Sequence, residues 1–498
     1  MWIQIALFVA SLVISYALQP KPTRPKPAAF EDFDFPTAED GTPHIVVFGD
    51  TWLTDWTVIG TGNYRNEAIV AKQKGLFGTK KSETGFRYFM GIHFGLCNSL
   101  DDVIEIKVAD KSIWDGSFPS HDILYLDKPD AFGGDKGEGG IEGNLYLMSG
   151  ASNQPVLPQL SEMLGPDIPA YRGVATAFFF FFFCSNGPYP KPWSLRVRRT
   201  QSGWDGAIWY PEKVTIWLND NNIKAMNAAH IIYEAQTNTI WGRGFHASQL
   251  DLQSFKSVAD QLYEEKFGIC LAWRRQDSLK EFIQQVVNQI GAAFFVDRTT
   301  GLWKLVLIRD NYKVSNLTTF DYSNGLLRID EDDNPANDAV SNQVVVTYRD
   351  PVSNEDRSIY AENLAAIQQH GIIQEHKSYA GIATADIAGR IAARDLKIVH
   401  SALKRFKLVF NRKAYYLQPA SVFILSLPER GIDSIIVRAV RIEHDVMTNG
   451  EITVTVVQDV FGLPKAHYVQ QQPSLYKPAV FDPLPVSKFK VFELPYVY

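Results

Sequence analysis

The chain has 498 residues, of which 46% are hydrophobic, 13% aromatic and 21% charged. This composition supports globular cores and excludes a disordered, collagen-like or polytopic membrane protein, and the length suggests about three domains of roughly 100 to 200 residues. Lys and Arg number 49 and Asp and Glu 55, which gives a net charge of −6. A protein that holds nucleic acid or an anionic membrane through an overall positive field is therefore disfavoured.

The first segment, residues 1–27, is expected to form a short apolar helix followed by a stiff linker. Residues 1–18 carry no charge, and their length is near the lower limit for a helix that spans a bilayer core of ~30 Å. A signal peptide is disfavoured, because no Lys or Arg precedes the apolar stretch and no small-residue cleavage site follows it. The prolines and cations that come next are typical of an extended linker. Such a helix must be buried in lipid or among copies of itself, and its candidate partner-binding residues are Trp2, Ile5, Phe8 and Leu12.

The next segment, residues 28–217, predicts a β-rich domain. Two Gly-rich segments, Gly60–Gly62 and Phe132–Gly143, are expected to connect strands. The second lacks the GxxxxGK[ST] motif and carries three carboxylates that would repel phosphate, so a hairpin loop is expected rather than a phosphate site. Six consecutive phenylalanines, Phe178–Phe183, predict a strand that is covered on both faces. The predicted strands are His44–Phe48, Phe86–Leu96, Val103–Val108, Leu124–Leu126, Val174–Phe183 and Ser194–Arg199.

Residues 218–328 predict a small α+β domain. The clearest helix begins at a capping box, Ser278–Glu281, and ends at Gly291. Two apolar segments within residues 292–308 then predict a hairpin that packs on the apolar stripe of this helix. Two further helices are expected at Ala228–Thr237 and Asp251–Lys266.

Residues 329–462 predict a barrel-like β domain with one helix at about Thr384–Val399. Alternating oxygens in the acidic stretch Asp330–Pro335 suggest a calcium loop, but the Gly and the bidentate Glu that such a loop requires are missing. A solvated inter-domain loop is therefore expected. Asn449-Gly450 predicts a two-residue hairpin turn. The predicted strands are Val344–Tyr348, Arg405–Phe410, Val422–Leu427, Ile435–Glu443 and Ile452–Val457.

The last segment, residues 463–498, is rich in Pro, Tyr and Phe and shows no periodicity. A freely solvated tail would leave these rings in water, so docking onto a partner is expected, with a disordered end as the alternative. The candidate docking residues are Tyr468, Tyr476, Phe481, Phe489 and Tyr498.

No catalytic, cofactor or metal motif is recognisable. HExxH and G-x-S-x-G are absent, and Cys97, Cys184 and Cys270 lie too far apart for a redox or zinc motif. We therefore expect no enzymatic activity, no cofactor and no metal. Tryptophans beside carboxylates, as at Trp204-Asp205, leave a hydrolase of glycans or cell walls with two acids as one alternative. The apolar N-terminus leaves a membrane-anchored binding protein as another.

Short motifs spread over residues 1–462 resemble a known family, the tail tip or baseplate hub proteins of long-tailed bacteriophages and gene-transfer particles. This family includes the N-terminal part of lambda-like host-specificity proteins. Besides the N-terminal helix and its Pro-rich continuation, the motifs are Phe33–Thr37, Ile45–Gly49, Phe132–Gly139, Ala170–Gly173, Asn186–Trp193, Arg196–Arg199, Ala229–Ile232, Trp241–Gly244 and Gln458–Phe461.

The resemblance implies a homotrimeric ring that closes or continues the tail tube at the distal end of the virion, built from tandem hub-type β-barrel or sandwich domains. The implied partners are the distal tail protein ring, the C-terminal end of the tape measure protein, tail or central fibre proteins and, transiently in the lumen, DNA. For the N-terminal helix two alternatives stay open, contact with the host membrane during ejection and burial among protein subunits alone. Direct receptor recognition is not expected, because the long extension of the lambda-like proteins is missing. A β-rich chain without disulfides also benefits from a closed ring, which removes open sheet edges.

Overall fold

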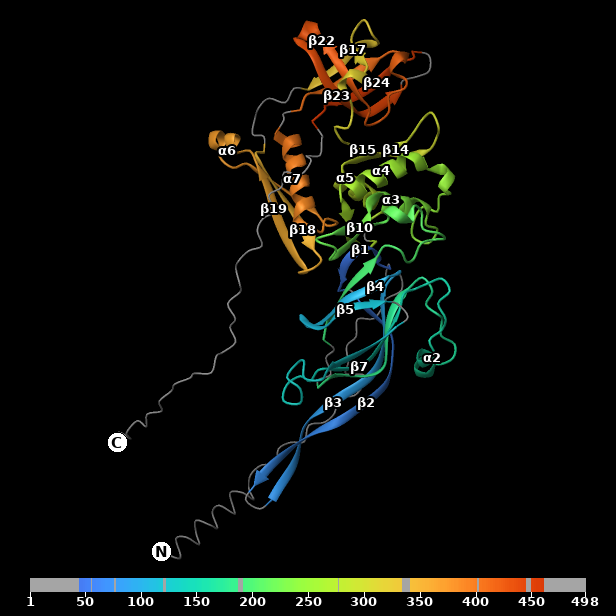
Figure 1. Ribbon diagram of the computed structural model, residues 1–498, viewed down its shortest axis with the longest axis vertical. Coiled ribbons are helices and arrows are strands. Elements are labelled where there is room, and N and C mark those ends of the chain that lie inside the picture. The colour runs from blue at the N-terminus through green and yellow to red at the C-terminus, as the bar shows by residue number, and fades with distance from the viewer. Residues whose placement is uncertain are drawn as a thin grey trace, which may run out of the picture.

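A computed structural model of the chain shows an elongated, mainly β molecule made of three stacked bodies (Figure 1). The lower body comprises residues 44–199, the middle body residues 200–316 and 341–400, and the upper body residues 317–333 and 403–460. The expected α+β, mainly β class is confirmed. The structure describes residues 44–54, 56–75, 78–119, 122–186, 191–275, 277–333, 341–400, 403–444 and 449–460.

In the lower body, two five-stranded sheets enclose one hydrophobic core. One sheet has the order β2-β3-β8-β7-β6. The other has the order β13-β1-β9-β4-β5 and takes β13 from the middle body. All strands predicted here are present. The elements are β1 Val46–Leu53, β2 Thr57–Gly75, β3 Gly78–Cys97, β4 Asp102–Val108, β5 Lys111–Pro119, β6 Ile123–Lys128, β7 Ile141–Met148, α2 Pro158–Leu164, β8 Ala175–Ser185 and β9 Trp193–Arg199.

The hairpin of β2 and β3 is the longest element of the fold and extends below the rest of the lower body (Figure 1). The expected connection at Gly60–Gly62 is wrong, because both glycines lie inside β2. The reason is close packing: a Cβ on Gly60 would come within 2.7 Å of Leu164 in α2, and one on Gly62 within 2.6 Å of Met163. Glycine here lets the helix approach the sheet rather than turning the chain.

The phenylalanine run forms β8 in the centre of its sheet. Phe179 and Phe182 enter the lower core, whereas Phe178 lies fully buried on the opposite face against His93. Phe180 and Phe181 are only partly buried. Coverage on both faces is therefore confirmed for part of the run. The Gly-rich segment after β6 forms the expected hairpin loop, in which Gly134 pairs with Gly139.

The middle body is built around one large core of helices and short sheets. Helix α5 has the predicted capping box and ends at Gly291 in the left-handed conformation, and the predicted β14–β15 hairpin is confirmed. The sheet β19-β18-β20 packs against α7, whose apolar side chains also enter this core. The elements are β10 Thr215–Leu218, β11 Ile223–Asn227, α3 Ala228–Thr237, α4 Leu252–Glu264, β12 Gly268–Ile269, β13 Leu271–Trp273, α5 Leu279–Ile290, β14 Ala292–Val296, β15 Trp303–Leu307, β18 Gln343–Asp350, β19 Glu355–Glu362, α6 Leu364–His370, β20 Gln374–Tyr379 and α7 Ala385–His400.

The upper body is a curved six-stranded sheet around its own core, with the order β16-β22-β23-β24-β21-β17. The expected acidic loop is wrong up to Asp333, because Asp330–Asp333 belongs to β17, where Lys407 and Arg430 offset its charge. The turn predicted at Asn449-Gly450 is also longer than two residues, since His444 pairs with Ile452. The elements are β16 Thr319–Phe320, β17 Leu326–Asp333, β21 Arg405–Phe410, β22 Val422–Leu427, β23 Ile432–His444 and β24 Ile452–Gln458.

Strand β1 belongs to two cores at once. Val46 and Phe48 enter the core of the middle body, whereas Val47 and Leu53 enter the core of the lower body. Because successive side chains of a strand point to opposite faces, one strand serves both bodies. The segment 329–462, which the sequence predicted as one β domain, likewise contributes residues to two cores, those of the middle and upper bodies.

Candidate functional site

The lower and middle bodies meet at a buried network of charges centred on Asp50. The Asp50 carboxylate is fully buried and accepts hydrogen bonds from Arg196 at 2.8 Å through both Nε and Nη2, and from Arg198 Nε at 2.9 Å. Both arginines lie on β9, which pairs with β1. Both guanidinium groups also donate to the carbonyl oxygen of Asn222 in the middle body. The network therefore ties β9 to both bodies.

A second buried ion pair lies beside this network. Arg199 and Glu234 are at most 1% exposed, and Arg199 Nη1 donates to Glu234 Oε2 at 2.9 Å. Arg199 also donates to the carbonyl oxygen of Val47. Burial raises the pKa of Glu234 above its ordinary value, while the neighbouring guanidinium acts in the opposite direction. The pair holds α3 against β9 at the joint between the two bodies.

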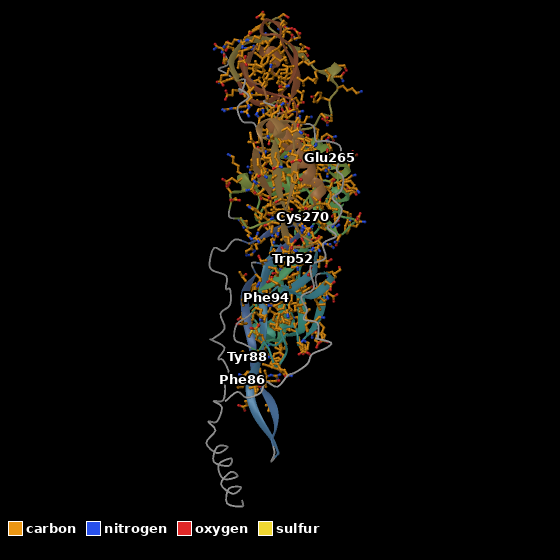
Figure 2. All side chains as sticks on the ribbon, turned by 90° about the vertical axis from the view of Figure 1, so that its left-hand side faces the viewer. Trp52, Phe86, Tyr88, Phe94, Glu265 and Cys270 are labelled. Carbon is orange, nitrogen blue, oxygen red and sulfur yellow. The ribbon has the colours of Figure 1, made fainter. Side chains whose placement is uncertain are left out.

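A cavity of about 380 Å³ opens next to this joint, between β1, β13 and the β18–β19 hairpin. On its wall, Trp52 Nε1 donates to the carbonyl oxygen of Pro351 at 2.8 Å, which links the lower body to the β18–β19 turn. Figure 2 shows Trp52 and Cys270 near this level of the molecule. Burial raises the pKa of the Cys270 thiol, and that of Cys97 to about 12, so neither is a thiolate nucleophile at neutral pH.

In the sheet β2-β3-β8-β7-β6, the face that points away from the lower core carries aromatic and charged side chains. The rings of Phe89 and Phe181 stack at 5.3 Å, and the guanidinium of Arg65 lies 5.2 and 4.9 Å from their centroids. Arg87 binds both oxygens of Asp135, at 2.7 and 2.5 Å, and so anchors the Gly-rich loop to β3. In Figure 2, Phe94, Tyr88 and Phe86 mark the course of β3 away from the joint. The carboxylates of this loop hold it in place.

The sheet β2-β3-β8-β7-β6 of the lower body has two edges that pair with no further strand among the described residues. Strands β2 and β6 are its two outer strands. On β6, Ile123 and Tyr125 are 53% and 55% exposed. An unpaired edge with exposed apolar side chains is a template for pairing with another chain.

The described titratable groups do not form a catalytic constellation. Burial lowers the pKa of His93 and of His230 to about 4, so both are neutral at pH 7, and neither contacts a carboxylate in the described structure. Asp205 accepts hydrogen bonds from the backbone and side chain of Thr239, which is a structural role for the carboxylate beside Trp204. Among the described residues no group of His, Cys, Asp and Glu is arranged to hold a metal ion. None of the described helices has the length and apolar character needed to cross a bilayer.

The predicted partner-binding residues lie outside the described residues. This holds for Trp2, Ile5, Phe8, Leu12, Tyr468, Tyr476, Phe481, Phe489 and Tyr498. Sequence reasoning missed the network around Asp50, because arginines at alternate positions of a strand are also the pattern of an ordinary exposed face. The one signal was the group of arginines at 196, 198 and 199 in a strand that also contains Trp193, Leu195 and Val197.

Comparison with solved structures shows a similar fold in one virion. A chain of the virion of a native gene transfer agent particle matches with a TM-score of 0.53 and 15% identity, over 90% of this chain and 91% of that chain. The two chains share a fold over nearly their whole length.

Two other structures match at lower scores. The tail protein from Neisseria meningitidis MC58 has a TM-score of 0.33 at 8% identity, over 80% of this chain and 97% of that chain. The prophage MuSo2 43 kDa tail protein from Shewanella oneidensis has a TM-score of 0.28 at 10% identity, over 72% of this chain and 97% of that chain. TM-scores this low do not indicate a shared fold. No protein-family model and no curated protein matches the sequence.

Proposed function

We propose that the chain is a structural protein of a phage tail or gene-transfer particle, and that three copies form a hub ring at the distal end of the tail tube. The observation that carries this proposal is the fold shared with a gene transfer agent virion chain over 90% of this chain. The short motifs that resemble tail tip proteins support the same assignment.

The open edges of the lower sheet support assembly into a ring. Strands β2 and β6 lie at opposite edges, so each copy offers two different edges to its neighbours. Contacts between unlike surfaces form a closed ring when the rotation between copies closes. Ring closure would pair these edges and bury Ile123 and Tyr125.

The proposed partners follow from a position at the tail tip. They are the distal tail protein ring, the C-terminal end of the tape measure protein and the tail or central fibre proteins, with DNA passing through the lumen. The N-terminal helix is proposed to be buried among copies or to meet the host membrane during ejection. A lumen with neutral or acidic side chains suits DNA passage, and the net charge of −6 is compatible with it.

Measuring the mass of the purified full-length chain, together with electron micrographs of particles labelled by an antibody to it, tests this proposal. We expect an assembly of three copies and label at one end of the tail. A stable monomer whose antibody labels no particle would contradict the proposal. Tight, salt-sensitive binding of duplex DNA to the assembly would contradict the proposed lumen.

A further inference from the structure

Helix α6 and the segments that flank it form an apolar projection, here called the α6 knob and defined by Tyr360, Leu364 and Ile372. These side chains are 57%, 64% and 64% exposed, and no residue of α6 is buried. From Asn363 to Gln374 the sequence contains no Asp, Glu, Lys or Arg. The helix is capped by its own Asn363 side chain rather than held by a core. Exposed surface that is apolar and depleted of charge is typical of an interface.

A second surface is formed by the loop between α3 and α4, the start of α4 and Trp303, here called the Trp303 patch and defined by Ile240, Arg243, Phe245, Leu252 and Trp303. Ile240 is 79% exposed, the highest value among the exposed large apolar side chains of the described residues. The guanidinium of Arg243 lies 5.1 Å from the Trp303 ring centroid and 5.8 Å from that of Phe245. The backbone N–H of Asp251, directly before Leu252, donates to the carbonyl oxygen of Trp303 at 2.8 Å. An aromatic ring with an arginine beside it is the composition of an interface hot spot.

The two surfaces lie on opposite sides of the molecule at a similar height. In Figure 1, α6 projects on the left, whereas α4 and the β14–β15 hairpin, which carry residues of the Trp303 patch, lie on the right. We propose that the α6 knob of one copy docks on the Trp303 patch of the next copy, as a head-to-tail contact of the ring in addition to the pairing of the β2 and β6 edges. This inference rests on the proposed function, and the occupant is a second copy because the two surfaces carry charges of opposite sign, Arg243 and Glu362, that form no ion pair in the described part of the chain.

The charges at the two surfaces are complementary. Arg243 donates to Gln236 Oε1 at 3.2 Å and forms no ion pair within the described structure. Beside the α6 knob, the exposed Glu362 accepts a hydrogen bond from Gln343 at 3.0 Å and likewise has no cationic partner among the described residues. Docking of unlike surfaces gives each of these charges a partner, which favours a contact between copies over an isologous pairing of two knobs.

The proposal predicts a specific pattern of complementation between two full-length variants. The knob variant carries Leu364→Glu and Ile372→Glu, and the patch variant carries Ile240→Glu and Leu252→Glu. Each variant alone is expected to be monomeric at concentrations at which the unmodified chain is trimeric, because every interface of its ring has lost one docking surface and keeps only the pairing of the β2 and β6 edges. An equimolar mixture is expected to give heterodimers by native mass spectrometry, because the intact knob of one variant meets the intact patch of the other.

Four further variants make the test selective. Replacing Tyr415 and Tyr416, which are 60% and 54% exposed in the upper body, by Glu is expected to leave assembly unchanged. Arg243→Glu or Glu362→Arg alone is expected to weaken assembly about tenfold, and the two together in one chain are expected to restore it. Matching thermal unfolding of all variants shows that loss of assembly is not loss of folding.

The outcomes separate this contact from the proposed function. If the unmodified chain forms a trimer and the knob and patch variants do so as well, the contact is wrong and the ring stands. If each variant is monomeric and the mixture gives no heterodimer, the two surfaces do not bind each other, and the contact is again wrong. A monomeric unmodified chain overturns both the ring and the contact.

Discussion

At the scale of single residues, Asp50 is the only carboxylate that the described structure places against the guanidinium groups of both Arg196 and Arg198. Their side chains are only 5% and 12% exposed. Asp50→Asn keeps the shape of the side chain but leaves two buried cations without a counter-charge. We expect a loss of about 3 to 5 kcal/mol in the free energy of unfolding, measured by urea denaturation of the full chain.

The matched control for this variant is Glu67→Gln. Glu67 pairs with Arg65 at 2.7 Å, but the two side chains are 46% and 57% exposed. Solvent screens such a pair, so little or no change in the free energy of unfolding is expected. Equal losses in the two variants would show that the buried network at the joint has no special role.

His93 predicts a defined dependence of stability on pH. Its ring is fully buried, neither ring nitrogen has a partner, and burial lowers its pKa to about 4 from an unfolded value of about 6.5. Between these two pH values the unfolded chain binds a proton that the folded chain does not. The contribution of His93 is therefore fully present above pH ~6.5 and is lost as the pH falls to ~4, a change of about 3 kcal/mol.

His93→Phe removes this titration and keeps a ring between Tyr171 and Phe178. We expect its unfolding temperature to fall less than that of the unmodified chain when the pH is lowered from 7 to 4. His230, whose pKa is also about 4, is retained in both proteins and contributes equally. Parallel pH profiles of the two proteins would contradict the assignment.

At the scale of elements, the packing of α2 on the sheet depends on the absence of a side chain at Gly91. A Cβ there would lie 2.3 Å from Met163 Sδ and 2.5 Å from the carbonyl oxygen of Phe180, and the backbone cannot yield as a flexible side chain does. Gly91→Ala is expected to cost about 1 to 3 kcal/mol in the free energy of unfolding. Gly85→Ala on the same strand meets only Ile69 at 3.7 Å and serves as the control. A smaller loss for Gly91→Ala than for Gly85→Ala would refute this packing argument.

The elements that were predictable are those whose determinants are local. The capping box at Ser278 and the glycine at 291 define helix α5 within 14 residues, and the structure has both. The glycines at 60 and 62 were wrongly predicted to connect strands. Glycine is needed there because α2, about 100 residues later in the chain, packs against both positions. The prediction for the acidic β17 was wrong for the same reason, because its charges are offset by Lys407 on β21 and by Arg430 in the turn before β23, both distant in the sequence.

The candidate sites were less predictable than the fold. The Asp50 network joins residues of β1, β9 and the β10–β11 turn, and only their pairing in space distinguishes these arginines from surface cations. The α6 knob does leave a local signal, the charge-free run around Leu364. Its meaning depends on exposure, which a sequence does not give.

At the scale of the whole molecule, the upper body is attached to the middle body mainly through polar contacts. Arg438 donates to the carbonyl oxygen of Arg309 at 2.8 Å, and Arg298 donates to that of Ile442 at 2.7 Å. The hydrophobic core of the upper body shares no residue with the core of the middle body. Calorimetry is therefore expected to resolve a separate unfolding transition for the upper body, and Arg438→Met is expected to lower its midpoint.

Hydrogen exchange, measured peptide by peptide, shows which elements unfold in that transition. Peptides from β21 and β22 are expected to exchange together, and independently of those from α3 and α5. A single transition that includes all of these peptides would show that the three bodies unfold as one unit.

The division of β1 between two cores also limits how this chain can change in length. A residue inserted or deleted between Val46 and Leu53 would turn the following side chains to the opposite face, so that residues of the lower core would point into the middle core and the reverse. No compensating change in one core would repair the other. Beyond Phe86, by contrast, the described side chains of the β2–β3 hairpin, at 67–70 and 83–85, belong to none of the described cores. Insertions and deletions among homologous chains of this fold are therefore expected to occur in that hairpin and to be absent from β1.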